Sequence, residues 1–282
     1  MLERALVGIA QWLPAPGRLE ENLDSALGFI QELGEAECDL IVLPELWPSG
    51  FDRASLARDL AQAAEPLDGP RTRALADAAA KASAWLAAGS VPERASDGRI
   101  YNTALLFSRE GELRAVHRKC HLYVPLGEDR ATSAGDRLTV CDTGDLGIVG
   151  LSVCFDGDFP EVARTLRARG ARLVVEPAAY EIAAERWWDL LYPAHALTNG
   201  QWWVMANQCG TPGSDTLFGG SRVISPSGEE VASARRAGPG ETPNPELLTV
   251  EIDLRAEIER ADREQSELWE GLRPDLYRDE SR

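Results

Sequence analysis

Short apolar segments alternate with segments of helical periodicity along most of the chain, and this alternation strongly constrains its fold. The apolar segments 5–10 and 40–43 have the length and composition of buried strands. Leucine and isoleucine recur at helical spacing in 19–34, and a proline opens the alanine-rich segment 70–83. Interspersed strands and helices, with several hairpins and no clear domain boundary, predict mixed sheets in a single α/β domain over residues 1–282.

The composition excludes several classes of protein. A formal charge of −17, from 29 basic and 46 acidic residues, argues against general nucleic-acid binding, which needs basic patches. No apolar run approaches the roughly 18 residues of a membrane span, and the first eleven residues lack the pattern of a signal peptide. Five cysteines without paired spacing predict a reducing, cytoplasmic compartment. We therefore expect neither nucleic acid nor a membrane as partner, and a surface acidified either for solubility or for a host with high internal salt.

One segment combines an apolar strand, a tight turn and a helix start around a single cysteine. The apolar run 146–153 ends at Cys154, the turn-forming residues 156–158 follow, and a proline opens the helical stretch 160–169. A thiol at a helix N-terminus ionises more easily and attacks better. A buried structural cysteine at a strand end is the alternative, and this segment alone leaves both open.

Two further chemically active side chains follow apolar strands. Glu45 follows the segment 40–44, and Lys119 ends the strand-like segment 113–119. In sheets flanked by helices, ligands collect at strand ends, where Cys154 also lies. Each charge alone has an ordinary explanation as a solvated group. Together the three residues supply a base, a cation and a nucleophile, which is what acyl transfer requires.

Histidine offers two alternative interpretations. A Cys–His pair that uses His117, His121 or His195 is not excluded by spacing, because partners in a fold need not be near in sequence. His117, Cys120 and His121 would also suggest a metal site. However, adjacent residues on an extended chain point in opposite directions, and no C-x-x-C pair accompanies them. We expect no metal and no organic cofactor.

The segments around these three residues carry motifs of a known family. The motifs are Leu43-Pro-Glu-Leu46, His117-Arg-Lys-Cys-His-Leu122 and Ser152-Val-Cys-Phe-Asp156, and weaker matches run in order from 7–11 to 273–277. On these motifs the chain resembles the nitrilase superfamily of carbon–nitrogen hydrolases. The resemblance implies a four-layer αββα sandwich and a triad of Glu45, Lys119 and Cys154. It also implies a second glutamate in the loop after the lysine, for which Glu128 is the match.

The resemblance implies a reaction and a role for each residue. Glu45 would be the general base, and Cys154 the nucleophile that forms a thioester. Lys119 and the backbone N–H of Phe155 would hold the oxyanion, and Glu128 would fix Lys119 or the substrate nitrogen. The expected reaction is hydrolysis of a small amide to a carboxylic acid and ammonia. An N-carbamoyl-amide hydrolase, a nitrilase and a non-catalytic scaffold are the alternatives.

The resemblance also indicates the residues that contact the substrate. Segments that line the pocket in relatives contain Tyr123, Tyr180, Trp187 and Trp188 here, and Phe155 follows the nucleophile. These aromatic side chains predict a narrow, apolar cleft that suits small aliphatic amides. For at least one of the two tryptophans, packing in the core is the alternative.

Two departures from the family pattern bear on the substrate. Phe155-Asp156 stands where true nitrilases have Trp-Glu, which favours amides over nitriles. Asp158 stands where many amidases of the family have arginine, so we expect an uncharged amide rather than one with a carboxylate. Capping of the helix 160–169 is the alternative role of Asp158.

Two segments predict self-association. The helix-like segment 182–197 carries more apolar surface than one helix face can bury, with Trp187, Trp188, Leu190, Leu191 and Tyr192. The C-terminal tail, about 256–282, is a second candidate for subunit contacts. We expect a homodimer or a higher homo-oligomer, as in the family, where dimers pair the sandwiches into a longer stack.

Overall fold

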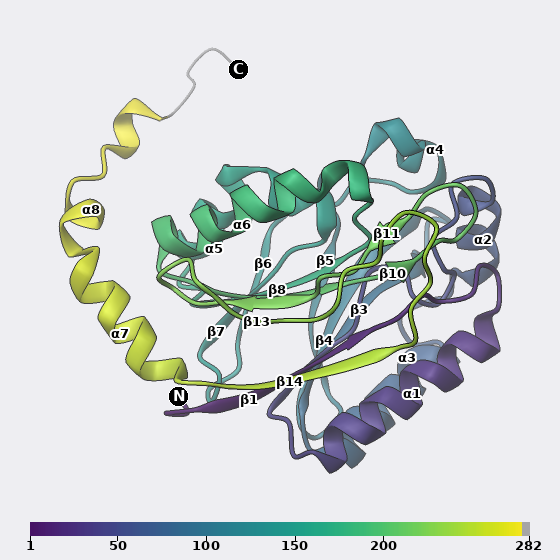
Figure 1. The fold of residues 1–282 in the computed structure, drawn as a ribbon, viewed down its shortest axis with the longest axis horizontal. Helices are drawn as coiled ribbons and strands as arrows, with labels where there is room; N and C mark the ends of the chain where they lie inside the picture. The colour runs from purple at the N-terminus through teal and green to yellow at the C-terminus, as the bar shows by residue number, and fades with distance from the viewer. Residues whose placement is uncertain (278–282) are drawn as a thin grey trace.

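The structure is a computed structural model that describes residues 1–277, and it contains two six-stranded sheets (Figure 1). The strands are β1 (Ala5–Gln11), β2 (Leu40–Val42), β3 (Trp85–Arg94), β4 (Ile100–Phe107), β5 (Leu113–Arg118), β6 (Thr139–Asp142), β7 (Ile148–Leu151), β8 (Leu173–Ala178), β9 (Trp202–Asn207), β10 (Cys209–Gly210), β11 (Leu217–Phe218), β12 (Arg222–Ile224), β13 (Glu230–Ser233) and β14 (Glu246–Ile252). The α-helices are α1 (Leu19–Glu35), α2 (Leu56–Ala63), α3 (Pro70–Ala82), α4 (Glu128–Ala131), α5 (Pro160–Ala168), α6 (Glu185–Asn199), α7 (Leu254–Glu264) and α8 (Ser266–Glu270). Four short 3₁₀ helices are η1 (Val124–Leu126), η2 (Cys154–Asp158), η3 (Ile182–Ala184) and η4 (Pro274–Leu276).

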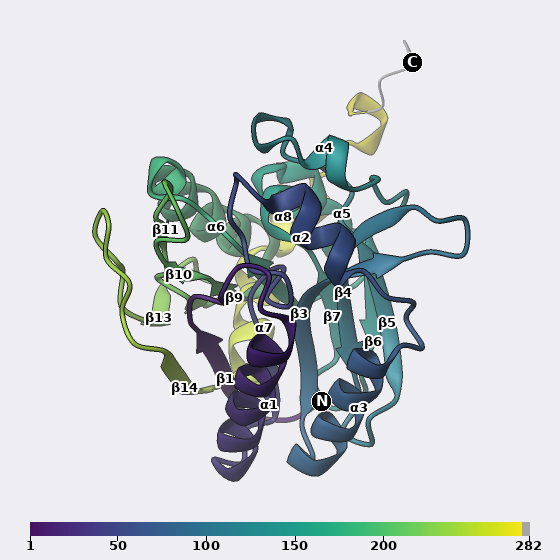
Figure 2. The same ribbon diagram turned by 90° about the vertical axis from the view of Figure 1, so that its right-hand side faces the viewer.

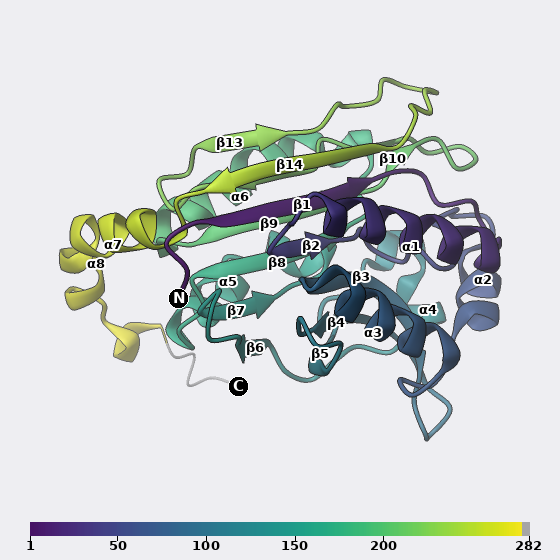
Figure 3. The ribbon, with the colours of Figure 1, turned by 90° about the horizontal axis from the view of Figure 1, so that it is seen from below.

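The two sheets face each other and form the two inner layers. The strand order is β14-β1-β2-β3-β4-β5 in the first sheet and β13-β12-β9-β8-β7-β6 in the second. Parallel pairs such as β1–β2, β2–β3, β7–β8 and β8–β9 lie beside antiparallel pairs at the edges, so both sheets are mixed. Figure 3 shows the strands of both sheets running side by side, with β1 and β14 at one side of the sandwich.

Alternate residues of the central strands face the partner sheet or a helix layer. In β2, Leu40 and Val42 belong to the core between the sheets, whereas Ile41 packs under α1 and α3. In β8, Leu173 likewise faces the other sheet, whereas Val174 packs under α5 and α6. Because both faces are covered, these strands are apolar at nearly every position rather than at every second one, with Glu176 of β8 as the exception.

The four layers therefore follow the order helix, sheet, sheet, helix. Figure 2 shows α1 and α3 on one outer side and α5 and α6 on the other. This arrangement confirms the expectation of an αββα sandwich. None of the helices within residues 1–277 combines the length and the hydropathy that crossing a membrane would require.

The sequence patterns missed several short elements. The polar segment 120–137, which has no helical or strand periodicity, contains η1 and the single-turn helix α4. The helix α2 and the two-stranded ribbon of β10 and β11 were also not expected. These elements are too short for hydrophobic periodicity to define them. The charged stretch 254–269, whose composition is compatible with one continuous helix, lies in two helices, α7 and α8, separated at Gln265.

The carboxyl ends of four strands from both sheets meet on one side of the sandwich. Glu45 and Lys119 lie just beyond β2 and β5 of the first sheet, and Cys154 and Tyr180 just beyond β7 and β8 of the second. One hydrogen bond connects the two sides here: the side-chain amide of Gln208, which follows β9 of the second sheet, donates to the carbonyl oxygen of Glu45 at 2.7 Å. The sandwich thus brings together residues that are up to 163 positions apart in sequence, as between Glu45 and Gln208.

Candidate active site

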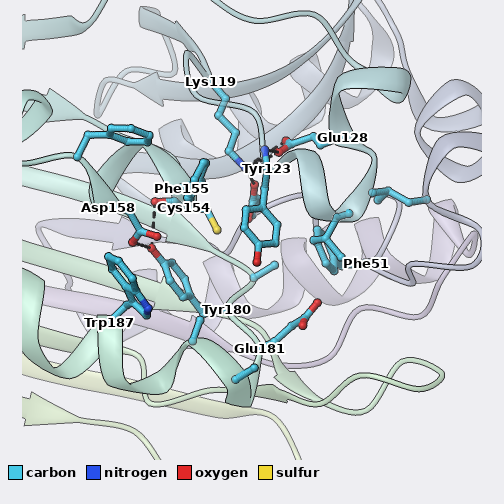
Figure 4. A pocket seen from close by; sticks show the side chains of 17 residues that line it. Phe51, Lys119, Tyr123, Glu128, Cys154, Phe155, Asp158, Tyr180, Glu181 and Trp187 are labelled. Carbon is cyan, nitrogen blue, oxygen red and sulfur yellow. Dashed lines mark hydrogen bonds and ion pairs between the residues drawn. The ribbon is translucent and has the colours of Figure 1, made fainter.

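A cavity of about 470 Å³ lies where these strand ends meet (Figure 4). Its walls come from the ends of β2, β5, β7 and β8, from α2, and from the segment that contains η1 and α4. The lining residues are Glu45, Phe51, Leu56, Lys119, Tyr123, Leu126, Glu128, Cys154, Phe155, Asp158, Phe159, Ala179, Tyr180, Glu181, Ala183, Ala184 and Trp187. Five acidic or basic side chains and one thiol are among them, so the cavity combines apolar walls with a few convergent polar groups.

Lys119 lies between two carboxylates on the first-sheet side of the cavity. Its Nζ donates to Glu45 Oε1 at 3.0 Å and to both oxygens of Glu128, at 3.1 and 2.9 Å. All three side chains are almost fully buried. A buried ammonium with two anionic partners is held in one position, because moving away from either would leave a charge unpaired.

Two polar side chains outside the predicted set complete this arrangement. Asn102 donates from Nδ2 to Glu45 Oε1 at 2.8 Å and to Glu128 Oε1 at 3.0 Å. The backbone N–H of Tyr123 donates to the other Glu128 oxygen at 2.8 Å. Gln208 holds the backbone of Glu45 from the second sheet. Asn102 lies in a segment that matches the family motifs only weakly, and the sequence around Gln208 carries no motif.

The protonation of this cluster is set by burial and by mutual charge. Burial raises the pKa of Glu45, an effect that Lys119 opposes and Glu128 reinforces. Burial alone would lower the pKa of Lys119, but the carboxylates of Glu128 and Glu45 raise it well above its ordinary value. Lys119 therefore stays a cation. One oxygen of Glu45, Oε2, has no hydrogen-bond partner within residues 1–277 and is free to accept a proton.

Cys154 lies at a sharp turn between β7 and α5. Its backbone has φ +48°, in the left-handed region that residues other than glycine rarely adopt. The hydroxyl oxygens of Tyr180 and Tyr192 lie 3.4 and 3.3 Å from its carbonyl oxygen, so both side chains pack against the turn. The side chain lines the cavity, as expected for a nucleophile presented at an elbow.

The thiol of Cys154 is not pre-ionised, contrary to the expectation from its place before a helix. Burial raises its pKa well above the ordinary value, and the nearby carboxylate of Glu45 raises it further. Lys119 lowers this pKa but does not outweigh the other two effects. The thiol is thus neutral at rest and needs a base to become a nucleophile.

Most of the predicted substrate contacts line the cavity, and one does not. Tyr123, Phe155 and Tyr180 are in its wall. Trp188 is fully buried and packs against Tyr180, with ring centroids 5.1 Å apart, so its predicted contact with substrate is wrong. Its neighbour Trp187, 55% exposed, lines the cavity instead. Successive helix residues are rotated by about 100°, so only one of two adjacent tryptophans can face the cavity.

Asp158 also lines the cavity, and it does not cap α5. The helix has no side-chain cap, and the Asp158 carboxylate accepts a hydrogen bond from the Tyr180 hydroxyl. Tyr180 in turn is 2.9 Å from the Tyr192 hydroxyl, which is 2.9 Å from Glu176 Oε1. A chain of hydroxyl groups therefore links Asp158 at the cavity to Glu176 in the core.

No histidine lines the cavity within residues 1–277, so the structure does not favour a Cys–His pair. His195 contacts the carbonyl oxygen of Gly157 at 3.0 Å. His117 Nε2 and His121 Nδ1 instead lie 3.0 and 2.8 Å from the two oxygens of Asp156. Burial alone would raise the pKa of Asp156, but these two hydrogen bonds hold it well below its usual range.

The group formed by His117, Cys120 and Asp156 has potential metal-ligand atoms within 4.8 Å of one another. The Asp156 oxygens, however, also accept the backbone N–H groups of Cys120 and His121, at 3.1 and 2.8 Å. The sulfur of Cys120 points at two carbonyl oxygens. These hydrogen bonds connect the turn at Cys154 to the segment that follows Lys119, which explains why the three side chains lie together. We therefore assign no metal to this cluster.

Comparison with known proteins relates the chain to carbon–nitrogen hydrolases in both sequence and structure. Residues 5–261 match the family described as Carbon-nitrogen hydrolase. The chain is 32% identical to Omega-amidase NIT2-A of Xenopus laevis over 96% of both proteins. Among solved structures, it resembles Saccharomyces cerevisiae Nit3, described as a member of branch 10 of the nitrilase superfamily. The TM-score is 0.81 and the identity 27%, over 93% of this chain and 94% of Nit3.

A second similar structure has a modified active-site cysteine. It is a mutant of the amidase from Nesterenkonia sp. AN1 in which acrylamide has added to the active-site cysteine. The match has a TM-score of 0.76 and 27% identity, and covers 91% of this chain and 98% of that one.

Proposed function

The chain belongs to the carbon–nitrogen hydrolase family, and from this premise we propose that it is an amidase. It hydrolyses a small amide to a carboxylic acid and ammonia through a thioester on a cysteine. The observation that carries the proposal is the buried contact of Lys119 with Glu45 and Glu128, in the wall of a cavity that also contains Cys154. Four groups suited to acyl transfer thus share one water-restricted space.

Acylation begins with the neutral thiol. Glu45, through its unpartnered oxygen, accepts the proton of Cys154, and the sulfur attacks the carbonyl carbon of the amide. The raised pKa of Glu45 makes this carboxylate a stronger base than a solvated one. Lys119 and the backbone N–H of Phe155 stabilise the negative oxygen of the tetrahedral intermediate.

Breakdown of that intermediate returns the proton. Protonated Glu45 gives it to the nitrogen, the C–N bond breaks, and ammonia leaves while the acyl group stays on the sulfur as a thioester. Glu45 then takes a proton from water, the resulting hydroxide attacks the thioester, and the acid leaves with restoration of the Cys154 thiol. Glu128 acts by holding Lys119 in position, since it contacts the ammonium with both oxygens.

The tail and helix α6 support a proposal about assembly. Trp187 and Leu190 on α6 are 55% and 58% exposed, and Leu268 and Leu276 in the tail are 48% and 66% exposed. We propose that a second copy of the chain covers this apolar surface in a homodimer, with the tail from about residue 256 in subunit contacts. Residues 278–282 of that predicted tail lie outside the described residues. Light scattering at micromolar concentration would give the mass of a dimer, and a monomeric mass would contradict the proposal.

Replacement of the nucleophile tests the proposed function. Cys154→Ala removes the attacking atom, so we expect ammonia release from a panel of amides to fall at least about 10⁴-fold. Circular dichroism should stay unchanged, because the cavity left by one sulfur is small. Wild-type release of ammonia from ureido compounds, with carbon dioxide, in preference to amides would instead identify a carbamoylase. Full activity in Cys154→Ala would refute the mechanism.

A further inference from the structure

The charges around the cavity are strongly unbalanced. Its lining includes the four carboxylates Glu45, Glu128, Asp158 and Glu181, and Lys119 as the one basic side chain among the described lining residues. Lys119 is shared by the first two carboxylates. Glu181 is paired with an arginine outside the cavity wall, Arg53, at 3.1 Å. Asp158 alone has no cationic side chain within 4.0 Å in residues 1–277.

The hydroxyl chain behind Asp158 favours a negative charge at this residue. Glu176 at the far end is completely enclosed, and burial raises its pKa well above the ordinary value, so it is protonated. A protonated Glu176 does not require the Tyr192 proton, which leaves the Tyr192 hydroxyl able to turn toward Tyr180 while Tyr180 donates to Asp158. In this arrangement the negative charge of the chain is on the carboxylate at the cavity, where the Tyr180 hydrogen bond and the charge of Lys119 lower the pKa of Asp158 against the effect of burial.

Aromatic rings adjoin the same part of the cavity. Figure 4 shows Asp158, Tyr180 and Trp187 together on one side of the Cys154 sulfur, with Lys119 and Glu128 on the other. An ammonium or guanidinium group is attracted to the faces of such rings as well as to a carboxylate. A neutral methyl group would gain only the apolar contact. A substrate carboxylate would face Asp158 with no cation to pair it.

We propose that Asp158 is a specificity-determining residue that selects amides whose acyl chain carries a positively charged group. The inference rests on the proposed amidase function and refines the substrate of the same site. It keeps the expectation that carboxylate-bearing amides are poor substrates, but it replaces the expected uncharged amide with a cationic one. The basic group is a primary ammonium or a guanidinium, separated from the reacting carbonyl by a short aliphatic chain.

Pairs of isosteric substrates test this proposal without a change of shape. Pentanamide and 4-aminobutanamide differ only in that a methyl group is replaced by an ammonium. The pairs butanamide with 3-aminopropanamide, and hexanamide with 5-aminopentanamide, cover shorter and longer chains. At pH 7.5 we expect kcat/KM to favour the cationic member of at least one pair by roughly ten- to hundredfold, as for a hydrogen bond between charged groups.

Three variants assign the preference to its residue. Asp158→Asn removes the charge and keeps an acceptor for Tyr180, so the ratio within the preferred pair should fall to near one. Asp158→Ser does the same with a smaller side chain, in case the first variant folds poorly. Asp129→Asn is the matched control, because it removes an exposed carboxylate near the site that does not line the cavity. It should keep the wild-type ratio, which separates local recognition from the general attraction of an acidic protein for cations.

Each result has a defined meaning. A cationic preference that collapses in the Asp158 variants and survives in Asp129→Asn supports the proposal. Equal rates within all three pairs, or a preference that persists without the Asp158 charge, overturn it and leave the amidase function intact. If the wild type releases ammonia from none of these amides or from the broader panel, the proposed function fails, and this inference fails with it.

Discussion

The two sides of the cavity stabilise buried carboxylates in opposite ways. On what we call the lysine wall, Glu45 and Glu128 surround the ammonium of Lys119. On the tyrosine wall, Glu176 and Asp158 are joined only through the hydroxyls of two tyrosines, Tyr192 and Tyr180. The first wall has internal compensation for its charge. On our proposal, the cation of the substrate pairs with the Asp158 charge of the second wall. The comparison assigns the base and the cation of the proposed reaction to one wall and the choice of substrate to the other.

The largest effect should come from a change to the cation of the lysine wall. Lys119→Arg keeps the charge, but the planar guanidinium cannot take the place of a compact ammonium between two carboxylates. We expect kcat/KM to fall roughly 10²- to 10³-fold for cationic and neutral amides alike, the loss typical of one oxyanion donor. Steady-state assays with 4-aminobutanamide and pentanamide measure this. A loss of kcat/KM confined to the cationic substrate would contradict the assignment of Lys119 to the reaction rather than to the choice of substrate.

A smaller effect is expected when one carboxylate of the lysine wall is neutralised. Glu128→Gln removes a charged hydrogen-bond partner of Lys119 but leaves Glu45 in contact with it. The expected loss in kcat/KM is about ten- to hundredfold, because a hydrogen bond between charged groups contributes about 1.5–3 kcal/mol. The ratio between 4-aminobutanamide and pentanamide should stay at its wild-type value. A change in that ratio would show that Glu128 contributes to substrate choice.

The smallest expected effect is a change in the pH dependence of the preference for the cationic amide when a residue of the tyrosine wall is replaced. The cationic preference is present above the pKa of Asp158 and is lost as the pH falls through it. Burial raises this pKa, while the Tyr180 hydrogen bond and the charge of Lys119 lower it. Tyr180→Phe removes the hydrogen bond, so the preference should disappear at a pH about one unit higher than in the wild type.

The measured quantity is the ratio of kcat/KM for the two isosteric amides from about pH 4 to about pH 8, a range that begins near the ordinary pKa of a carboxylate. Titration of the lysine wall affects both substrates and cancels in the ratio. An unchanged midpoint in Tyr180→Phe would indicate that Tyr180 does not stabilise the Asp158 carboxylate.

The sequence predicted the lysine wall better than the tyrosine wall. Glu45, Lys119 and Cys154 each follow an apolar strand, so the general rule for strand ends identified them before any relative was considered. The family motifs then added Glu128, which lies in a loop without periodicity. The long strands and helices were also recognised, because their apolar residues repeat at a fixed spacing.

The tyrosine wall depends on tertiary contacts that no local pattern encodes. Glu176 stands in the apolar strand β8 and looked like an ordinary strand residue, yet it meets Tyr192 from α6. The orientation of Trp187 toward the cavity and Trp188 toward the core depends on the rotation of α6 against the second sheet. A shift of one position in that helix would exchange the two, so residue type alone could not decide between them.

The origin of the reacting groups from opposite sheets has a mechanical consequence. The proposed base and cation follow strands of the first sheet, whereas the proposed nucleophile follows a strand of the second. Apolar side chains fill most of the space between the two sheets. The rate of turnover therefore depends on the distance between two sheets that have no covalent connection at the site. Slippage of about 1 Å would misalign the reaction, although every strand kept its own hydrogen bonds. On heating, catalysis should fade before the far-ultraviolet circular dichroism records any melting.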